Sequence, residues 1–176
     1  NCGVESGNQD ILNNIRKGTS LEQIRRAYKI ARKLKLKTLA SFMFGLPGET
    51  KETIQNTIDF AVELDPDMAF FFILTPFPGS AIYGEYKDKL FNVSENWSDF
   101  KYVLTDGTIA LESREFTKEE LKSYLVEANR RFFMRPKFLA KQLIRIRSFD
   151  ELKANLTGAI TLFKQMRFIS PKGTKT

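Results

Sequence analysis

Apolar and polar positions follow two different periods along the chain, and these periods predict both strands and helices. Two nearly continuous apolar runs, Thr38 to Phe44 and Met68 to Leu74, are typical of parallel strands that are covered on both faces. A shorter stretch, Asn1 to Ser6, predicts the stub of a third strand. Segments with helical spacing separate these runs, so the strands recur every ~30 residues, as in βαβ units. The pattern therefore predicts an α/β fold with a parallel sheet.

Capping and turn residues divide the chain into four parts. Helix starts are predicted at Ser20 with Gln23, after Thr50, at Thr117 with Glu120, at Pro136, and at Ser148 with Glu151. The predicted parts are an α/β region at 1–82, an irregular connecting segment at 83–116, a helical region at 117–169 and a loose tail at 170–176. Within the connecting segment, the turn residues Thr105 to Thr108 are compatible with a small hairpin.

Composition excludes several kinds of chemistry. One Cys and no His among 176 residues rule out disulfide frameworks, zinc sites built from Cys and His, and mechanisms that depend on His. A metal site made only of carboxylates stays open. The one cysteine, Cys2, is predicted to be a small buried side chain. No apolar run is long enough to span a bilayer, and the first residues are not a signal region, which predicts a soluble, cytoplasmic chain.

The net charge of +7 is concentrated in the second half of the sequence. Residues 1–111 carry a net charge of −1, and residues 112–176 carry +8. The basic and aromatic segment Arg130 to Lys137 is compatible with a nucleic-acid patch or with a solvated face, and Phe132 falls on the apolar side of its helix. The basic segment therefore makes nucleic acid a candidate partner of this chain.

Three glycine- or proline-containing motifs follow the three predicted strands. Gly3 to Gly7 places Glu5 at a strand end, where ligands of parallel sheets bind, although a plain turn would look the same. Gly45 to Thr50 is compatible with either a ligand-binding turn or a rigid connection to the next helix. Thr75 to Gly79 by itself indicates only that the third strand ends.

Taken in order, these motifs resemble the radical S-adenosylmethionine (radical SAM) superfamily. Gly3 to Gly18 is similar to the fourth-strand region of those enzymes, Phe42 to Thr53 to the fifth strand and its turn, and Leu74 to Ser80 to the end of the sixth. The later segments Trp97 to Asp106, Arg130 to Pro136 and Arg145 to Ser148 look like the subgroup with a cobalamin-binding domain, typified by anaerobic magnesium-protoporphyrin IX monomethyl ester cyclase. The resemblance implies the C-terminal half of a partial (β/α)₆ barrel, strands four to six, followed by a mostly helical region.

The same resemblance implies cofactors and five contact residues. A [4Fe–4S] cluster and S-adenosylmethionine would act in the parent protein, and whether cobalamin is also used stays open. The cluster needs three thiolates, so this chain, which opens with Asn1 instead of Met, is interpreted as a piece cut downstream of the cluster-binding cysteines. The implied S-adenosylmethionine contacts are Glu5, Lys17, Ser41, Met43 and Ile73.

Two functions are therefore hypothesised. In the first, the chain is part of a radical SAM enzyme that makes a 5′-deoxyadenosyl radical for methylation, cyclisation or rearrangement of a sizeable, tetrapyrrole-like small molecule. The isolated piece is then expected to be inactive, and the upstream part of the same polypeptide is its partner. In the second, the basic C-terminal helices bind RNA or tRNA.

Overall fold

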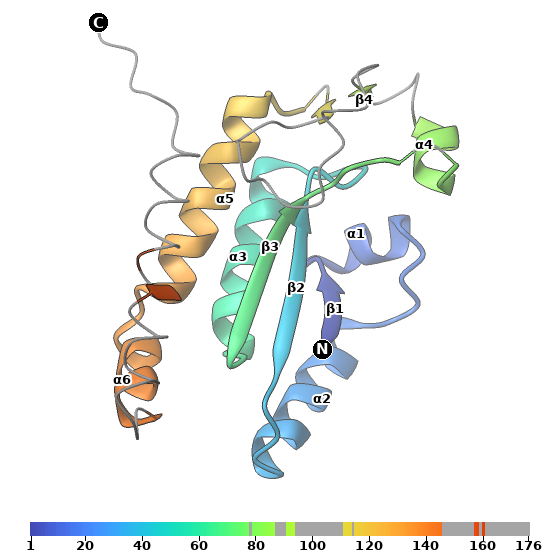
Figure 1. Cartoon of the computed structure of the whole chain (residues 1–176). Coiled ribbons are helices and arrows are strands. Elements are labelled where there is room, and N and C mark those ends of the chain that lie inside the picture. The colour runs from blue at the N-terminus through green and yellow to red at the C-terminus, as the bar shows by residue number, and fades with distance from the viewer. Residues whose placement is uncertain are drawn as a thin grey trace, which may run out of the picture.

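A three-stranded parallel sheet lies at the centre of the computed structural model of the chain (Figure 1). Strands β1 (Cys2–Glu5), β2 (Leu39–Phe44) and β3 (Met68–Ile73) pair in the order β1-β2-β3. The structure describes residues 1–77, 79–86, 91–93, 111–113, 115–145, 157, 158 and 160. The predicted α/β fold with a parallel sheet is confirmed over this part of the chain.

Six helices and a second pair of strands complete the described part. The helices are α1 (Gln9–Asn14), α2 (Leu21–Lys33), α3 (Lys51–Leu64), α4 (Ala81–Tyr86), α5 (Lys118–Phe133) and α6 (Pro136–Arg145). Strands β4 (Phe91–Val93) and β5 (Leu111–Ser113) pair in antiparallel fashion. The turn suggested at 105–108 and the tail at 170–176 lie outside the described residues, as does nearly all of the helix predicted after Ser148.

The helix starts agree with the capping residues in the sequence. Ser20 and Thr117 each accept a hydrogen bond from the backbone N–H three residues later, and Gln23 and Glu120 return a bond to the cap, so both capping boxes are complete. Thr50 and Thr53 form a third box at the start of α3. Each cap satisfies backbone N–H groups that have no partner inside the helix, which fixes where the helix begins.

Among the described residues, helices pack against one face of the sheet. Alternate strand residues on that face are buried, namely Val4, Ala40, Phe42, Phe44, Ala69, Phe71 and Ile73. Phe71 lies against Phe132 of α5, with ring centroids 6.1 Å apart, which confirms Phe132 as a core residue. Burial of these apolar side chains provides the main stabilisation of the fold.

The opposite face of the sheet is only partly covered by the described residues. We call it the open face, and it consists of Gly3, Leu39, Ser41, Met43, Met68, Phe70 and Phe72. Met68 is 38% exposed and Phe70 is 44% exposed. The expectation that both faces are covered is therefore wrong for this part of the chain. The side chains on the open face are nevertheless mostly apolar. This explains why each strand appears in the sequence as a continuous apolar run instead of an alternation of apolar and polar residues.

The basic segment at the end of α5 makes internal contacts. Arg131 donates to Gln55 at 3.1 Å and pairs with Asp59, both on α3. Arg135 donates to the backbone carbonyl of Val62 at 2.9 Å, and its guanidinium lies 4.2 Å from the ring centroid of Phe132. These arginines hold α5 and α6 against α3, so much of the segment has a structural role.

Candidate functional site

Glu5 ends β1 in a strained turn that turns its side chain back over the strand. The Ser6 N–H donates to the Val4 carbonyl at 2.9 Å, which closes a three-residue turn around Glu5. Glu5 has a φ of +67°, and a γ-turn with a positive central φ is rare and strained. The pairing with β2 shifts register between Gly3 and Glu5 at the same place. Strain of this kind is concentrated at ligand sites, where surrounding structure maintains it.

Lys17 reaches Glu5 because of the way α1 ends. The Lys17 N–H donates to the Leu12 carbonyl at 2.9 Å and the Arg16 N–H to Asn13 at 2.9 Å, while Arg16 adopts a φ of +54°. This is the hydrogen-bond pattern of a Schellman motif, which reverses the chain after a helix. The Lys17 ammonium then donates to Glu5 Oε1 at 2.8 Å.

Gly3 makes room for this ion pair at the surface of the sheet. A Cβ at Gly3 would lie 2.5 Å from Glu5 Oε1 and 3.2 Å from Lys17 Nζ. The absence of a side chain thus lets the carboxylate and the ammonium lie directly on the strand. Both remain partly exposed, with 21% of the Glu5 side chain and 30% of the Lys17 side chain accessible. The pair is therefore open to a polar ligand.

Ser41 and Met43 bring further groups to the same face. Ser41 is the register partner of Gly3, and Met43 lies two residues along β2, beside Phe72 of β3. Within the described part of the chain, neither the Ser41 hydroxyl nor Glu5 Oε2 has a hydrogen-bond partner. The structure thus brings four of the five sequence-derived contacts, Glu5, Lys17, Ser41 and Met43, to the side of the sheet on which Gly3 lies.

Ile73 lies on the other side of the sheet from these residues. It is only 7% exposed, belongs to the core, and pairs with Phe44 of β2, which is itself fully buried. The residue of β3 that lies beside Met43 on the open face is Phe72. The structure therefore does not bring Ile73 together with the other four.

A buried polar cluster supports the turn after β1. The Ser6 and Thr57 hydroxyls are 3.2 Å apart, and the Gly7 N–H donates to Thr57 Oγ1 at 2.9 Å. The Thr57 hydroxyl in turn donates to the Thr53 carbonyl at 3.0 Å. Sequence reasoning did not identify Thr57, whose only signal is a polar residue among the apolar positions of α3. The cluster fixes the turn that carries Glu5 against α3.

Glu49 has a structural role in the turn after β2. Its Oε2 accepts hydrogen bonds from the Gly45 N–H at 2.6 Å and the Leu46 N–H at 3.0 Å, while Oε1 has no partner among the described residues. Burial raises the pKa of Glu49 to about 7, although the bonds from Leu46 and Gly45 act in the opposite direction. Of the two alternatives for Gly45 to Thr50, the geometry favours the rigid connection.

Cys2 is exposed at the start of β1, so the expectation of a buried cysteine is wrong. Within the described residues there is no group of three or more Cys, Asp or Glu side chains placed to hold a metal ion. The same part of the chain contains no helix that is both long and apolar enough to cross a bilayer.

The geometry defines an α/β protein whose candidate ligand-binding groups lie at the carboxyl end of β1 and on the open face. A family model described as the radical SAM superfamily matches residues 1–61. Over 93% of its length the chain is 35% identical to an uncharacterised methyltransferase of Pyrococcus horikoshii, of which it covers 34%. It is 30% identical, over 94% of its length, to an anaerobic magnesium-protoporphyrin IX monomethyl ester cyclase of Rubrivivax gelatinosus, of which it covers 28%.

A further relative is the bacteriochlorophyllide d C-8(2)-methyltransferase of Chlorobaculum tepidum, which is 26% identical over 97% of this chain. The chain covers 39% of that relative, so it spans about a third of the length of the relatives that it matches. Residues 1–61 thus match the radical SAM superfamily, and the similarity to these relatives extends over nearly the whole chain.

Proposed function

We propose that the chain supplies strands four to six of a radical SAM barrel, and that its open face binds S-adenosylmethionine. The single observation that carries this proposal is the ion pair between Lys17 Nζ and Glu5 Oε1, which are 2.8 Å apart. The pair lies over Gly3, which has no side chain to displace it, in a chain that matches the radical SAM family model. The ammonio and carboxylate groups of a methionine moiety have the charges that Glu5 and Lys17 can pair with. Bound S-adenosylmethionine would supply the radical chemistry of the family.

The described residues fit this cofactor in polarity and in placement. Glu5 Oε2 and the Ser41 hydroxyl have free hydrogen-bonding capacity within the described part of the chain, which suits a ribose hydroxyl or an ammonio group. Met43 and Phe72 are neighbours in the sheet and give an apolar surface for an adenine ring. The strained turn at Glu5 holds the carboxylate in place before the ligand arrives, which lowers the entropic cost of binding.

The residues of the chain do not fit an iron–sulfur cluster. Three thiolates would be needed, and the chain contains one cysteine, which is exposed on β1. We therefore derive no step that involves a cluster held by this chain, and we propose that the cluster ligands come from another part of the parent enzyme.

The substrate that we propose is a sizeable, largely apolar small molecule, for methylation or cyclisation by the parent enzyme. Met68 and Phe70 extend the open face beyond the residues assigned to the cofactor, and both are more than a third exposed. A flat macrocycle would bury these side chains. The names of the relatives, a cyclase and methyltransferases with tetrapyrrole-related names among them, support this choice.

The cofactor proposal is tested by titration of the 176-residue chain with S-adenosylmethionine. Met43 and Met68 lie on the open face, whereas Met134 lies at the end of α5, so methyl NMR separates specific binding from general effects. We expect the Met43 resonance to shift with saturation and the Met134 resonance to stay unchanged. Glu5→Gln should raise Kd by about tenfold, because one charge-assisted hydrogen bond is weakened.

The matched control is Glu22→Gln, which removes one carboxylate from the exposed first turn of α2 and should leave Kd unchanged. The proposal is contradicted if the Met43 resonance does not shift at a concentration of S-adenosylmethionine high enough to saturate even a weak site. It is equally contradicted if the two substitutions change Kd by the same factor.

Anaerobic treatment of the chain with iron and sulfide is expected to give no stoichiometric [4Fe–4S] cluster, because one cysteine cannot hold it. Iron and acid-labile sulfide analysis, together with the visible absorption spectrum, measures this. Cys2→Ser is the control and should give the same low background of iron. A cluster at one per chain that Cys2→Ser abolishes would overturn the assignment.

A further inference from the structure

A basic cavity lies at the amino end of the sheet, away from the residues assigned to the cofactor. Its volume is about 320 Å³, which is within the range of small-ligand pockets. Thr38 and Asp67, which precede β2 and β3, line it together with residues from the C-terminal ends of α2 and α3 and from α6. Glu5 and Glu49 lie at the carboxyl ends of their strands, so the cavity is a separate site.

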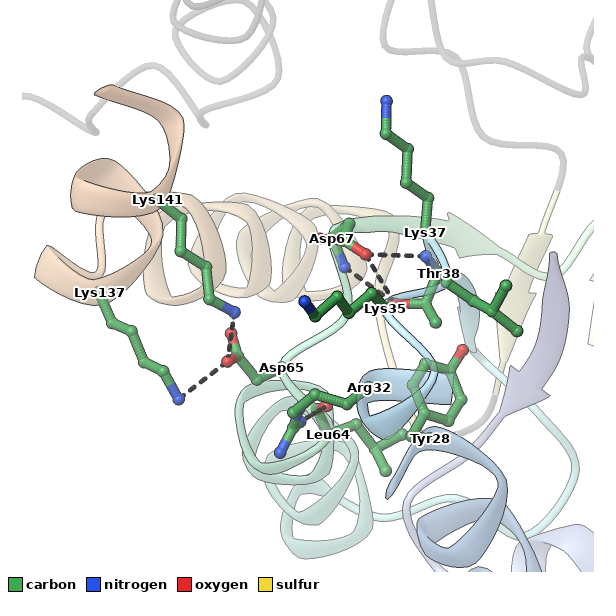
Figure 2. A pocket seen from close by; sticks show the side chains of 11 residues that line it. Tyr28, Arg32, Lys35, Lys37, Thr38, Leu64, Asp65, Asp67, Lys137 and Lys141 are labelled. Carbon is green, nitrogen blue, oxygen red and sulfur yellow. Dashed lines mark hydrogen bonds and ion pairs between the residues drawn. The ribbon is translucent and has the colours of Figure 1, made fainter. Parts of the chain in front are cut away.

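Positive charge predominates in this cavity. Five basic side chains line it, Arg32, Lys35, Lys37, Lys137 and Lys141, against two carboxylates, Asp65 and Asp67, which leaves a net charge of +3. In Figure 2, Lys137 and Lys141 reach toward Asp65 from α6, and Lys35 reaches into the same space from the end of α2. Lys37 points away from the others in that view.

Both carboxylates are already engaged inside the protein. Asp65 has only 3% of its side chain exposed and lies 2.9 Å from Lys137 Nζ, 2.6 Å from Lys141 Nζ and 3.3 Å from Arg135. Burial would raise the pKa of Asp65, but the bonds and charges of Lys141 and Lys137 outweigh it and hold this pKa below its usual value. One carboxylate with three cations leaves a positive excess.

Asp67 Oδ2 accepts from both the Thr38 N–H at 2.8 Å and the Thr38 hydroxyl at 3.2 Å. Lys35, in contrast, forms no ion pair with any residue that the structure describes. Its ammonium is therefore available to a ligand.

Two of the charged residues are held in conformations that favour glycine. Lys35 has a φ of +56° and follows α2 in a Schellman motif, in which the Leu36 N–H donates to Ala31 at 2.9 Å. Asp65 has a φ of +46° and caps α3. Glycine would adopt either conformation at lower cost. Two neighbouring helices thus end in strained charged residues that line one cavity, as is common at binding sites.

We infer that this cavity binds the phosphate group of a small phosphorylated molecule. A phosphate has up to two negative charges near neutral pH and several acceptor oxygens, which suits ammonium groups that approach from two helix ends. A single carboxylate would leave most of the positive excess unpaired. The volume admits a mononucleotide-sized ligand and excludes the bulk of a folded nucleic acid. The inference does not depend on the S-adenosylmethionine site.

The test is titration of the 176-residue chain with inorganic phosphate and with adenosine 5′-monophosphate at low salt, followed by amide NMR of Thr38, Leu64 and Asp67. Saturable shifts of these amides are expected. Lys35→Gln should weaken binding by about fivefold, since one charge-assisted contact is lost, and Lys35→Arg should restore it. Stronger binding of the monophosphate than of free phosphate would identify an ester as the ligand, and the reverse order would overturn that identification.

Lys29→Gln is the matched control, because Lys29 is exposed on α2 and does not line the cavity. It should leave both affinities unchanged. Since Lys35 makes no ion pair with the described residues, its replacement should not affect the midpoint of urea unfolding, which separates a binding effect from a folding effect. Equal weakening by Lys29→Gln and Lys35→Gln would overturn the inference, because it would indicate diffuse surface attraction.

Absence of saturable shifts with both phosphate probes would equally overturn it. A single-stranded RNA without terminal phosphates is the last arm. If the RNA shifts these amides and the small phosphates do not, the cavity is part of a nucleic-acid surface and the inference is wrong.

Discussion

Replacement of Gly7 by alanine is expected to lower the free energy of unfolding by about 3 kcal/mol, or to prevent folding altogether. A Cβ at this position would lie 2.6 Å from the Asn56 carbonyl oxygen, 2.6 Å from Phe60 Cβ and 2.7 Å from Thr57 Cα. Two of these atoms belong to the backbone of α3, and the third is a Cβ, whose position the backbone fixes. Rotation of a side chain therefore cannot relieve the clash. Urea unfolding of the chain measures the effect.

Gly84→Ala is the control for this substitution. Gly84 lies in α4, and nothing lies within 4 Å of the position that its Cβ would take. Alanine there should leave the stability unchanged or raise it by up to about 1 kcal/mol, since alanine is the better helix former. Equal unfolding midpoints for the Gly7 and Gly84 variants would show that the turn after β1 can move away from α3.

The Gly7 result bears on how the first motif is interpreted. By residue type alone, Gly3 and Gly7 could each let the backbone approach a ligand closely. The structure shows that Gly7 lets the turn approach α3, with the Gly7 N–H bonded to Thr57. Gly3 alone makes room on the open face. One motif therefore combines a packing requirement and a binding requirement, which a pattern of residue types cannot separate.

Local signals predicted the elements well. The capping boxes at Ser20 and Thr117 depend on residues three positions apart, and the structure places helices directly after both. The strands predicted at 38–44 and 68–74 occur at Leu39–Phe44 and Met68–Ile73. These features were accessible because each is decided by neighbours in the chain.

Neighbouring residues in the sequence did not predict which strand side chains face the core. The run Phe70-Phe71-Phe72 has no polar residue to mark one face, so a shift of one residue changes which side chains are buried. Phe71 proves to be buried and Phe70 exposed. The resemblance places Ile73 among the S-adenosylmethionine contacts, whereas in the structure Ile73 faces the core and its neighbour Phe72 lies on the open face.

Contacts between distant segments were also inaccessible. The cavity at the amino end of the sheet brings Lys35 together with Lys141, more than a hundred positions apart, and only the packing of α6 against α3 places them there. The burial of Glu49 is of the same kind. A Glu at a helix start is commonly exposed, and nothing local indicates that the turn after β2 encloses its carboxylate.

Glu49 is expected to make the chain less stable as the pH rises from about 5 to 7. Its pKa is raised from 4.5 to about 7 in the folded state, so folding favours the protonated carboxyl. Below the unfolded pKa both states are protonated and no penalty arises. Between the two pKa values the unfolded chain releases the proton first, and above the folded pKa the full cost of about 3 kcal/mol is present. Urea unfolding at a series of pH values measures this slope.

Glu49→Gln should remove the slope, because a neutral amide keeps an acceptor oxygen for the Gly45 and Leu46 N–H groups and does not titrate. Glu52→Gln, in the first turn of α3, is the matched control and should retain it. No histidine contributes to the slope between pH 5 and 7, since the chain has no His. The lowered pKa values of Asp65, Glu63 and Glu120 place their effects at more acidic pH. The same slope in the wild-type chain and in Glu49→Gln would mean that another group produces it, which would contradict the raised pKa of Glu49 in the folded protein.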